Sequence, residues 1–406
     1  MSDTTFKNQS QYVADELMLK QPMTRIIFCT YWLYFFGLRY VLGGVRLLDY
    51  IGMSLVVLGL MNLMHNRLIN WRFVGWVILL MCPMFIAAIL DASEYIILFL
   101  LKSFLVVLYF TCYFKSMRLT IVELVCFTIP VAVSVYYFLY PRVADEVHLL
   151  AGRLTGIDEP NFTSLSLIYA LCGAFGIYIL RHMKLAKMGA LLIATICLFG
   201  VVLTASMSGF IGAIIALCCF LVIEKRKSLV IALAAVIIAL NLSATYLSNL
   251  VVIQRFQDII FPNATVVNKL YGGRDRLAEL AWSSISSGDW FFGGGPQRLN
   301  EWGSYISFAV PHNSLLDIGI EFGRASFYFY SAMFVIFLVM NVRTIVRNRQ
   351  CRNYEEKTAI LAAMLFLSLI PMYLSLSTGM AMTFILWMVL GAYPLLHPTP
   401  KHTIVQ

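Results

Sequence analysis

The stretch RFVGWVILLMCPMFIAAIL at residues 72–90 carries no charged side chain after Arg72. A helix rises about 1.5 Å per residue, so a run of about 20 apolar residues crosses the roughly 30 Å hydrocarbon core of a bilayer. Polar and apolar residues do not alternate here as they do in a half-buried strand. The stretch therefore predicts a transmembrane helix.

Comparable apolar runs recur along the chain of 406 residues, which is 60% hydrophobic and only 13% charged, with a mean hydropathy of +0.81. A soluble domain cannot bury that much apolar surface. We predict an all-α fold, a polytopic transmembrane helical bundle of about twelve spans. The predicted spans are 25–41, 47–64, 72–90, 95–114, 119–139, 163–181, 188–205, 208–223, 228–248, 324–342, 358–376 and 378–396.

The net charge of +9 comes from basic residues in short connections between apolar runs, not from a basic soluble module. We therefore exclude nucleic acid as a partner. Lysine and arginine are enriched in cytoplasmic connections, and here they occupy every second connection. This pattern predicts cytoplasmic N and C termini, and we expect the first helix to be an anchor, not a cleaved signal peptide. The basic residues are Arg67, Arg72, Lys115, Arg118, Arg181, Lys184, Lys187, residues 225–227, Arg343, Arg347, Arg349 and Arg352.

The chain has nine cysteines, most of them inside apolar runs, and no spacing typical of a zinc site. We interpret them as small apolar residues and expect neither a metal site nor a cofactor. Lys102 lies within a predicted span, where a charge is costly. It should face a cavity or a partner such as Glu123.

One connection is much longer than the others and faces outward by the same charge pattern. It covers residues 249–323, and a loop of that length typically carries short helices of its own. We predict three regions: an N-terminal transmembrane bundle of about nine spans at 1–248, the outer loop at 249–323, and the C-terminal spans with a cytoplasmic tail at 324–406.

Of the six histidines, only His148 and His312 are expected on the outer side. In AVPHNSLLDIGIEFGRAS, residues 309–326, Pro311 ends what precedes it, and Asn313 or Ser314 can cap the following helix. The N-terminus of a helix favours a neutral imidazole, so His312 could accept a proton. The alternative is that His312 and Asn313 only cap the helix.

Two further outer segments contain arginines that could bind an anion. In YGGRDRLAELAW, residues 271–282, Arg274 and Arg276 lie at a predicted helix start, where backbone N–H groups also attract phosphate oxygens. The alternative is pairing with Asp275, Glu279 or lipid headgroups. In GRLTGIDEPNF, residues 152–162, Arg153 precedes the helix start at Pro160 and Asn161, and it is either an anion ligand or an exposed arginine.

Between the arginine segment at 271–282 and His312 lies GDWFFGGGPQRLNEWGSY, residues 288–305, with aromatic side chains around three glycines. The aromatic rings could stack on sugars or anchor the loop at the membrane interface.

Five stretches in this order resemble the O-antigen ligase and polymerase superfamily of bacterial inner-membrane glycosyltransferases. They are RLTGIDEPN at 153–161, TASMSG at 204–209, GGRDRLAELAW at 272–282, FFGGGPQ at 291–297 and HNSLLDIGIEFG at 312–323.

The resemblance implies a periplasmic active site in which Arg153, Arg274 and Arg276 bind the pyrophosphate of an undecaprenyl-linked sugar donor. It implies that His312 activates the acceptor hydroxyl, with Arg274 also catalytic. Asn161 and Asn313 are the remaining expected substrate-binding residues. The implied reaction is metal-independent and inverting, and the implied partners are the lipid-linked glycan, membrane lipid, a chain-length regulator and a flippase.

Two positions depart from the family pattern. Met207 stands where many members have arginine, and Ser326 stands where ligases favour Gly, Thr or Tyr. The second departure, together with the form of the arginine segment, favours a repeat-unit polymerase for O-antigen, capsule or exopolysaccharide. The alternatives are a ligase that transfers glycan to lipid A core, a flippase or transporter of lipid-linked sugars, and a structural membrane subunit.

Overall fold

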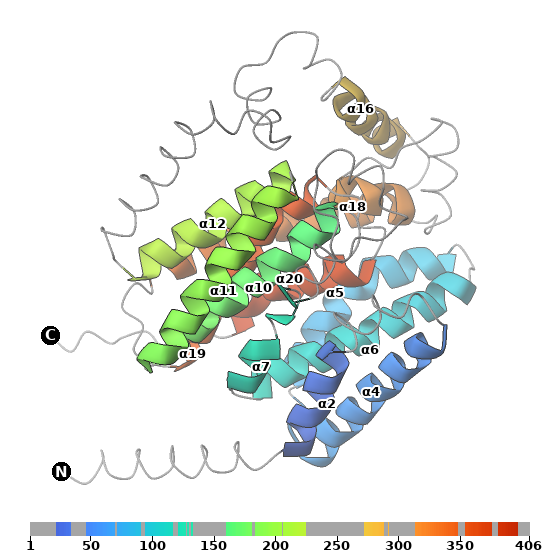
Figure 1. The fold of residues 1–406 in the computed structure, drawn as a ribbon. Helices are drawn as coiled ribbons and strands as arrows, with labels where there is room; N and C mark the ends of the chain where they lie inside the picture. Colours follow the sequence, from blue (N-terminus) through green and yellow to red (C-terminus); the bar gives the residue numbers. More distant parts are fainter. Residues whose placement is uncertain are drawn as a thin grey trace, which may run out of the picture.

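The computed structural model describes the chain in helical segments (Figure 1). The described residues are 22–33, 46–69, 71–90, 94–116, 121–126, 128–129, 131–132, 160–180, 183–204, 206–224, 272–287, 291, 313–347, 354–375 and 381–396. Every long element within these ranges is a helix, which confirms the predicted all-α class.

Most of the helices follow the predicted apolar runs to within a few residues, while α2 and α7 cover only part of the predicted spans 25–41 and 119–139. The first group is α2 (Pro22–Leu33), α4 (Arg46–His65), α5 (Trp71–Leu90), α6 (Glu94–Ser116) and α7 (Ile121–Cys126). The second group is α10 (Pro160–Leu180), α11 (Lys184–Leu203), α12 (Met207–Glu224), α16 (Gly272–Ser287), α18 (Ser314–Arg347), α19 (Tyr354–Tyr373) and α20 (Ala381–Leu396).

Six helices in the described part of the chain are long and apolar enough to cross a membrane. They are Trp71–Leu90, Thr163–Leu180, Lys184–Leu203, Met207–Glu224, Ser314–Arg347 and Glu356–Tyr373. The predicted span 228–248 lies outside the described residues. The total of about twelve spans and the division into three regions stay predictions.

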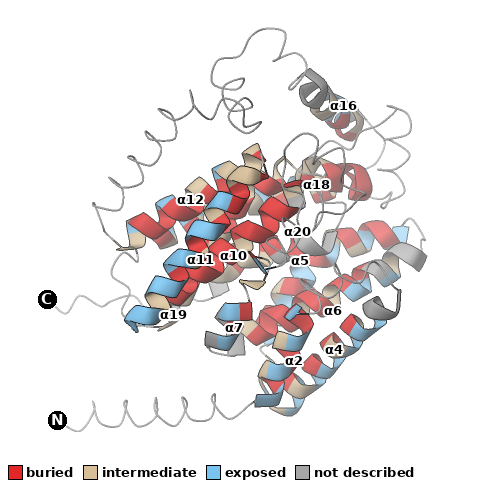
Figure 2. Ribbon diagram, viewed as in Figure 1, coloured by how far each residue is buried: buried red, intermediate tan, exposed pale blue. Residues whose placement is uncertain are grey.

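Buried apolar side chains form two main clusters, and Figure 2 marks buried residues in red on many of the helices. The smaller cluster joins α2, α4, α6 and α7, and the larger one includes α5, α10, α11, α12, α18, α19 and α20. Helix α6 belongs to both, because Tyr109 packs into the smaller cluster and Val107 into the larger one. The two groups of helices are therefore joined along α6.

Helix α10 lies at the centre of the larger cluster, with 89% of its membrane-length segment buried. Small residues let its neighbours approach closely, as in other helix pairs in membranes. A Cβ added to Gly209 of α12 would lie 1.5 Å from Ser164 Oγ of α10. A Cβ added to Gly212 would lie 2.4 Å from the Ser368 carbonyl oxygen of α19. Because these two glycines lack side chains, α12 can lie close to both helices.

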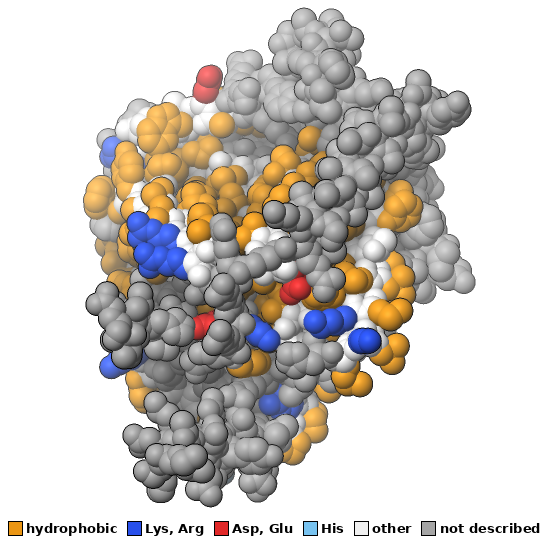
Figure 3. Space-filling model, turned by 90° about the vertical axis from the view of Figure 1, so that its left-hand side faces the viewer, with side chains coloured by type: hydrophobic (Ala, Val, Ile, Leu, Met, Phe, Trp, Pro, Cys, Tyr) orange, Lys and Arg blue, Asp and Glu red, His pale blue; other side chains and the backbone are white. Residues whose placement is uncertain are grey.

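The outer surface of the bundle is strongly apolar. Only 22% of the membrane-length segment of α11 is buried, and Leu185, Leu192 and Phe199 are more than 60% exposed. Figure 3 shows hydrophobic side chains over much of one face, with lysine and arginine in a few small groups. Such a face suits hydrocarbon and not water.

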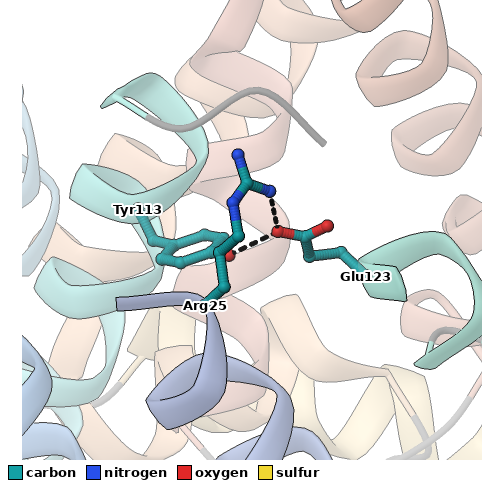
Figure 4. Close-up of polar contacts among 3 residues, drawn as sticks. All are labelled: Arg25, Tyr113 and Glu123. Carbon is teal, nitrogen blue, oxygen red and sulfur yellow. Dashed lines mark hydrogen bonds and ion pairs between the residues drawn. The ribbon is translucent and has the colours of Figure 1, made fainter. Parts of the chain in front are cut away.

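The predicted pairing of Lys102 with Glu123 is wrong. Glu123 is fully buried and forms an ion pair with Arg25 of α2, while the Tyr113 hydroxyl donates to Glu123 Oε1 at 2.8 Å (Figure 4). Lys102 is exposed on α6. The reason is distance along the helix: Lys102 lies eleven residues before Tyr113, which is roughly 16 Å.

Candidate functional site

Asn313 caps the first turn of α18. Its Oδ1 accepts hydrogen bonds from the N–H groups of Leu315 at 3.0 Å and Leu316 at 3.3 Å. The Asn313 carbonyl accepts the N–H of Asp317 at 2.9 Å. Of the two residues predicted to cap this helix, Asn313 is therefore observed in that role. Its predicted contact with substrate stays a prediction.

Helix α18 is broken at Gly323, which has φ of 87° and ψ of 173°. A side chain is strained at such a positive φ, so glycine suits the position. The break divides α18 into a short helix at 314–322, which we call the site helix, and a long helix at 324–347. The site helix buries Asp317 and Glu321 at 3% and 4% exposure, which places two carboxyl groups one turn apart inside the protein. Ionising both at once is disfavoured by their mutual repulsion.

Helix α16 packs against the site helix through a small apolar cluster. Ala281 and Ile285 of α16 are buried with Ile320. A Cβ added to Gly319 would lie 2.6 Å from Ile285 Cδ1, so the absence of a side chain there permits the close approach. On the long helix, the ring of Phe327 lies 5.4 Å from that of Trp282. Figure 1 shows α16 above the first part of α18.

Two polar contacts attach the last turn of α16 and the segment after it to the first turn beyond Gly323. Arg324 Nη1 donates to the Ser286 carbonyl oxygen at 3.1 Å. The Ala325 N–H donates to the Phe291 carbonyl oxygen at 3.0 Å. Sequence reasoning missed Arg324. Its one signal was an arginine between a glycine and a long apolar run.

The structure brings parts of three of the five stretches near one another. Ala281 of the stretch at 272–282 is buried with Ile320 of the site helix, and the Phe291 carbonyl oxygen of FFGGGPQ accepts from the N–H of Ala325, three residues beyond the site helix. Arg274 and Arg276 belong to the start of α16, as predicted, but their side chains lie outside the described residues. Arg153 and His312 also lie outside the described residues. The structure therefore leaves the convergence of these four side chains a prediction.

The turn at 204–209 packs against the first turns of α10, the helix in which the stretch at 153–161 ends. The Gly209 N–H donates to Ser206 Oγ at 3.3 Å, and the Ser206 N–H donates to Thr204 Oγ1 at 3.3 Å. These bonds shape the turn between α11 and α12, which packs by Gly209 on Ser164 of α10. Asn161 is half-buried in the first turn of α10. In Figure 1 this turn and the start of α10 lie towards the same end of the bundle as α16.

Within the described residues, no group of three His, Cys, Asp or Glu side chains could hold a metal ion. Because parts of the long loop lie outside those residues, the predicted independence from metal stays a prediction.

Residues 189–331 match a family model described as O-antigen ligase. No curated protein was found that matches the chain. The matched segment contains the turn at 204–209, α16, Phe291 and the site helix, and it begins after the stretch at 153–161. Over residues 189–331, this match supports the resemblance of the chain to the O-antigen ligase and polymerase superfamily.

Proposed function

We propose that this chain polymerises undecaprenyl-pyrophosphate-linked oligosaccharide repeat units at the periplasmic face of the bacterial inner membrane. The product would be an O-antigen, capsule or exopolysaccharide. The family match and the membrane-length helices already indicate a membrane enzyme of O-antigen or polysaccharide assembly. The donor, the reaction and the residue roles are the proposed part.

In the proposed reaction, an acceptor hydroxyl oxygen attacks the anomeric carbon of the donor. The bond from that carbon to the pyrophosphate oxygen breaks, undecaprenyl pyrophosphate leaves, and the configuration inverts. His312 takes the proton from the acceptor hydroxyl. Arg153, Arg274 and Arg276 stabilise the negative charge that grows on the leaving pyrophosphate, so no metal ion is required.

The packing of α16 on the site helix is the observation that carries this proposal. One helix bears Arg274 and Arg276 at its start, and the other begins at Ser314, whose cap Asn313 directly follows His312 in the chain. Contact between Ile285 and Gly319 holds the two helices together. Anion binding and base catalysis need elements held in fixed relation, and this contact supplies that relation.

A ligase is the second candidate, because the matching family model is described as O-antigen ligase. A ligase would use the same donor and transfer finished glycan to lipid A core. The two candidates differ in the acceptor. Ser326, at the position where ligases favour Gly, Thr or Tyr, is the feature that favours polymerase; it is fully buried in the long helix.

The surface glycan of a deletion strain separates the two candidates. We expect core carrying one repeat unit, because ligation would continue without polymerisation. Bare core would instead support the ligase. If the glycan is unchanged, both proposals fail.

Purified protein given lipid-linked repeat units as its sole substrate should produce a ladder of products. His312→Ala should abolish the ladder, since general-base catalysis contributes about 10²–10⁴-fold. The matched control is His65→Ala, because His65 is an exposed histidine at the end of α4. A ladder that survives His312→Ala would contradict the proposed base.

A further inference from the structure

We infer that Arg324 is a positioning residue for the proposed reaction. It holds the carboxyl end of α16 and so fixes the helix that bears Arg274 and Arg276 against the site helix. This inference rests on the proposed function. It assigns Arg324 a role that the motifs alone do not indicate.

The contact is placed where a helix end needs a partner. The last carbonyl groups of a helix have no intrahelical donor, and they form the negative end of the helix dipole. Ser286 lies in the last turn of α16, and its carbonyl oxygen accepts from Arg324 Nη1 at 3.1 Å. A guanidinium therefore satisfies both the hydrogen bond and the charge at this end.

Ala325, the residue after Arg324, holds the chain that follows the end of α16. Ala325 is in the first turn after the break at Gly323, where backbone N–H groups also have no intrahelical acceptor. Its N–H donates to the Phe291 carbonyl oxygen at 3.0 Å. Arg324 therefore binds Ser286 in the last turn of α16, and Ala325 binds Phe291 just after that helix.

The geometry makes the start of α16 sensitive to this contact. Helix α16 has 16 residues and is roughly 24 Å long. Its described contacts with α18 involve Ala281, Trp282, Ile285 and Ser286, all in its second half. A tilt of about 5° at the held end moves the far end by about 2 Å. A misplacement of about 1 Å can reduce a reaction rate about 100-fold.

The side chain also has limited freedom. Arg324 is only partly exposed, and its Nε is buried without a hydrogen-bond partner in the described part of the protein. The chain leaves the helical conformation at Gly323, so Arg324 does not continue the regular helix of residues 314–322. The arginine and the glycine break therefore act together.

The test compares Arg324→Ala and Arg324→Lys with Arg343→Ala. Arg343 lies on the same helix but is exposed at its far end, so its loss controls for the removal of a positive charge. Arg324→Ala should lower kcat about 10- to 100-fold and leave the KM for lipid-linked donor within about threefold. Arg324→Lys should recover most of kcat, because an ammonium group still donates to the Ser286 carbonyl. Arg343→Ala should behave as the wild type.

Amide hydrogen exchange provides a readout independent of activity. Exchange in residues 277–287 should be faster in Arg324→Ala than in the wild type and in Arg343→Ala. Ser286→Ala should leave exchange and kcat unchanged, since the acceptor is the backbone carbonyl. If Arg324→Ala is poorly folded, Arg324→Lys and its exchange pattern carry the test.

A rise in KM without faster exchange would overturn the inference and make Arg324 a direct donor ligand. Wild-type kcat and exchange in Arg324→Ala would overturn it as well. If the wild-type protein makes no ladder, the proposed function fails, but the exchange comparison still tests whether Arg324 holds α16.

Discussion

At the scale of single residues, Asn313 caps α18 and is also a proposed substrate-binding residue. Its Oδ1 accepts two N–H groups of the first turn, which is a structural role. Its amide nitrogen is not needed for that cap. Because the cap uses only Oδ1, the amide nitrogen can contact a substrate without loss of the cap. Asn313 directly follows His312 in the chain. Substitution can separate the two roles, because aspartate caps as well as asparagine does.

We expect Asn313→Asp to keep the stability of the wild type and to lose at least about tenfold in kcat/KM. The cap is retained, but a carboxylate replaces the amide donor and repels the pyrophosphate of the donor. Asn313→Ala should lower the free energy of unfolding by about 1 kcal/mol. Thermal unfolding in detergent and the ladder assay measure the two effects. Full activity of Asn313→Asp would restrict Asn313 to capping.

At the scale of helices, buried polar pairs join elements that the apolar pattern leaves unspecified. The ion pair of Arg25 and Glu123, with the Tyr113 hydroxyl, ties α2, α6 and α7 together in the smaller cluster (Figure 4). A buried pair costs little to replace as a whole, but removing one partner leaves an uncompensated charge.

Glu123→Ala should therefore lower the free energy of unfolding by about 3 kcal/mol or more. The double variant Arg25→Met with Glu123→Leu should recover most of that loss, because neither charge remains buried. Lys102→Met is the matched control, since Lys102 is exposed and has no part in the pair. Thermal unfolding of the purified variants measures all three. Equal destabilisation by the single and double variants would contradict the pair.

At the scale of the whole molecule, the charge pattern and the packing bear on orientation in the membrane. Arg343 and Arg347 lie at the end of α18 opposite the site helix and α16. Positive residues collect on the cytoplasmic side, so this end should be inside and α16 outside.

Single cysteines in a cysteine-free background test this orientation. Ser283→Cys on α16 should react with a membrane-impermeant maleimide added to spheroplasts, because Ser283 is exposed and expected on the outer side. Arg347→Cys, exposed at the other end of α18, should react only after the membrane is permeabilised. The reverse pattern would place the proposed site in the cytoplasm and end the proposed function.

Apolar runs were sufficient to predict most of the helices. A backbone in hydrocarbon must satisfy its own hydrogen bonds, so a run of sufficient length leaves the helix as the simplest structure. For this reason the run at 72–90 corresponds to α5, and the helix start predicted at Arg274 and Arg276 falls in the first turns of α16, which begins at Gly272. The cap at Asn313 was predictable because capping depends on neighbouring residues alone.

By itself, then, the sequence determined which segments are helical and where several of them begin, and it carried the resemblance to the O-antigen ligase family that the match over residues 189–331 supports. Tertiary structure alone decided which distant polar groups meet. It replaced Lys102 with Arg25 as the partner of Glu123, and it brought Arg324 to the Ser286 carbonyl. The physical reason is that apolar periodicity and caps are local, whereas these contacts depend on the break at Gly323 and on how closely the helices pack.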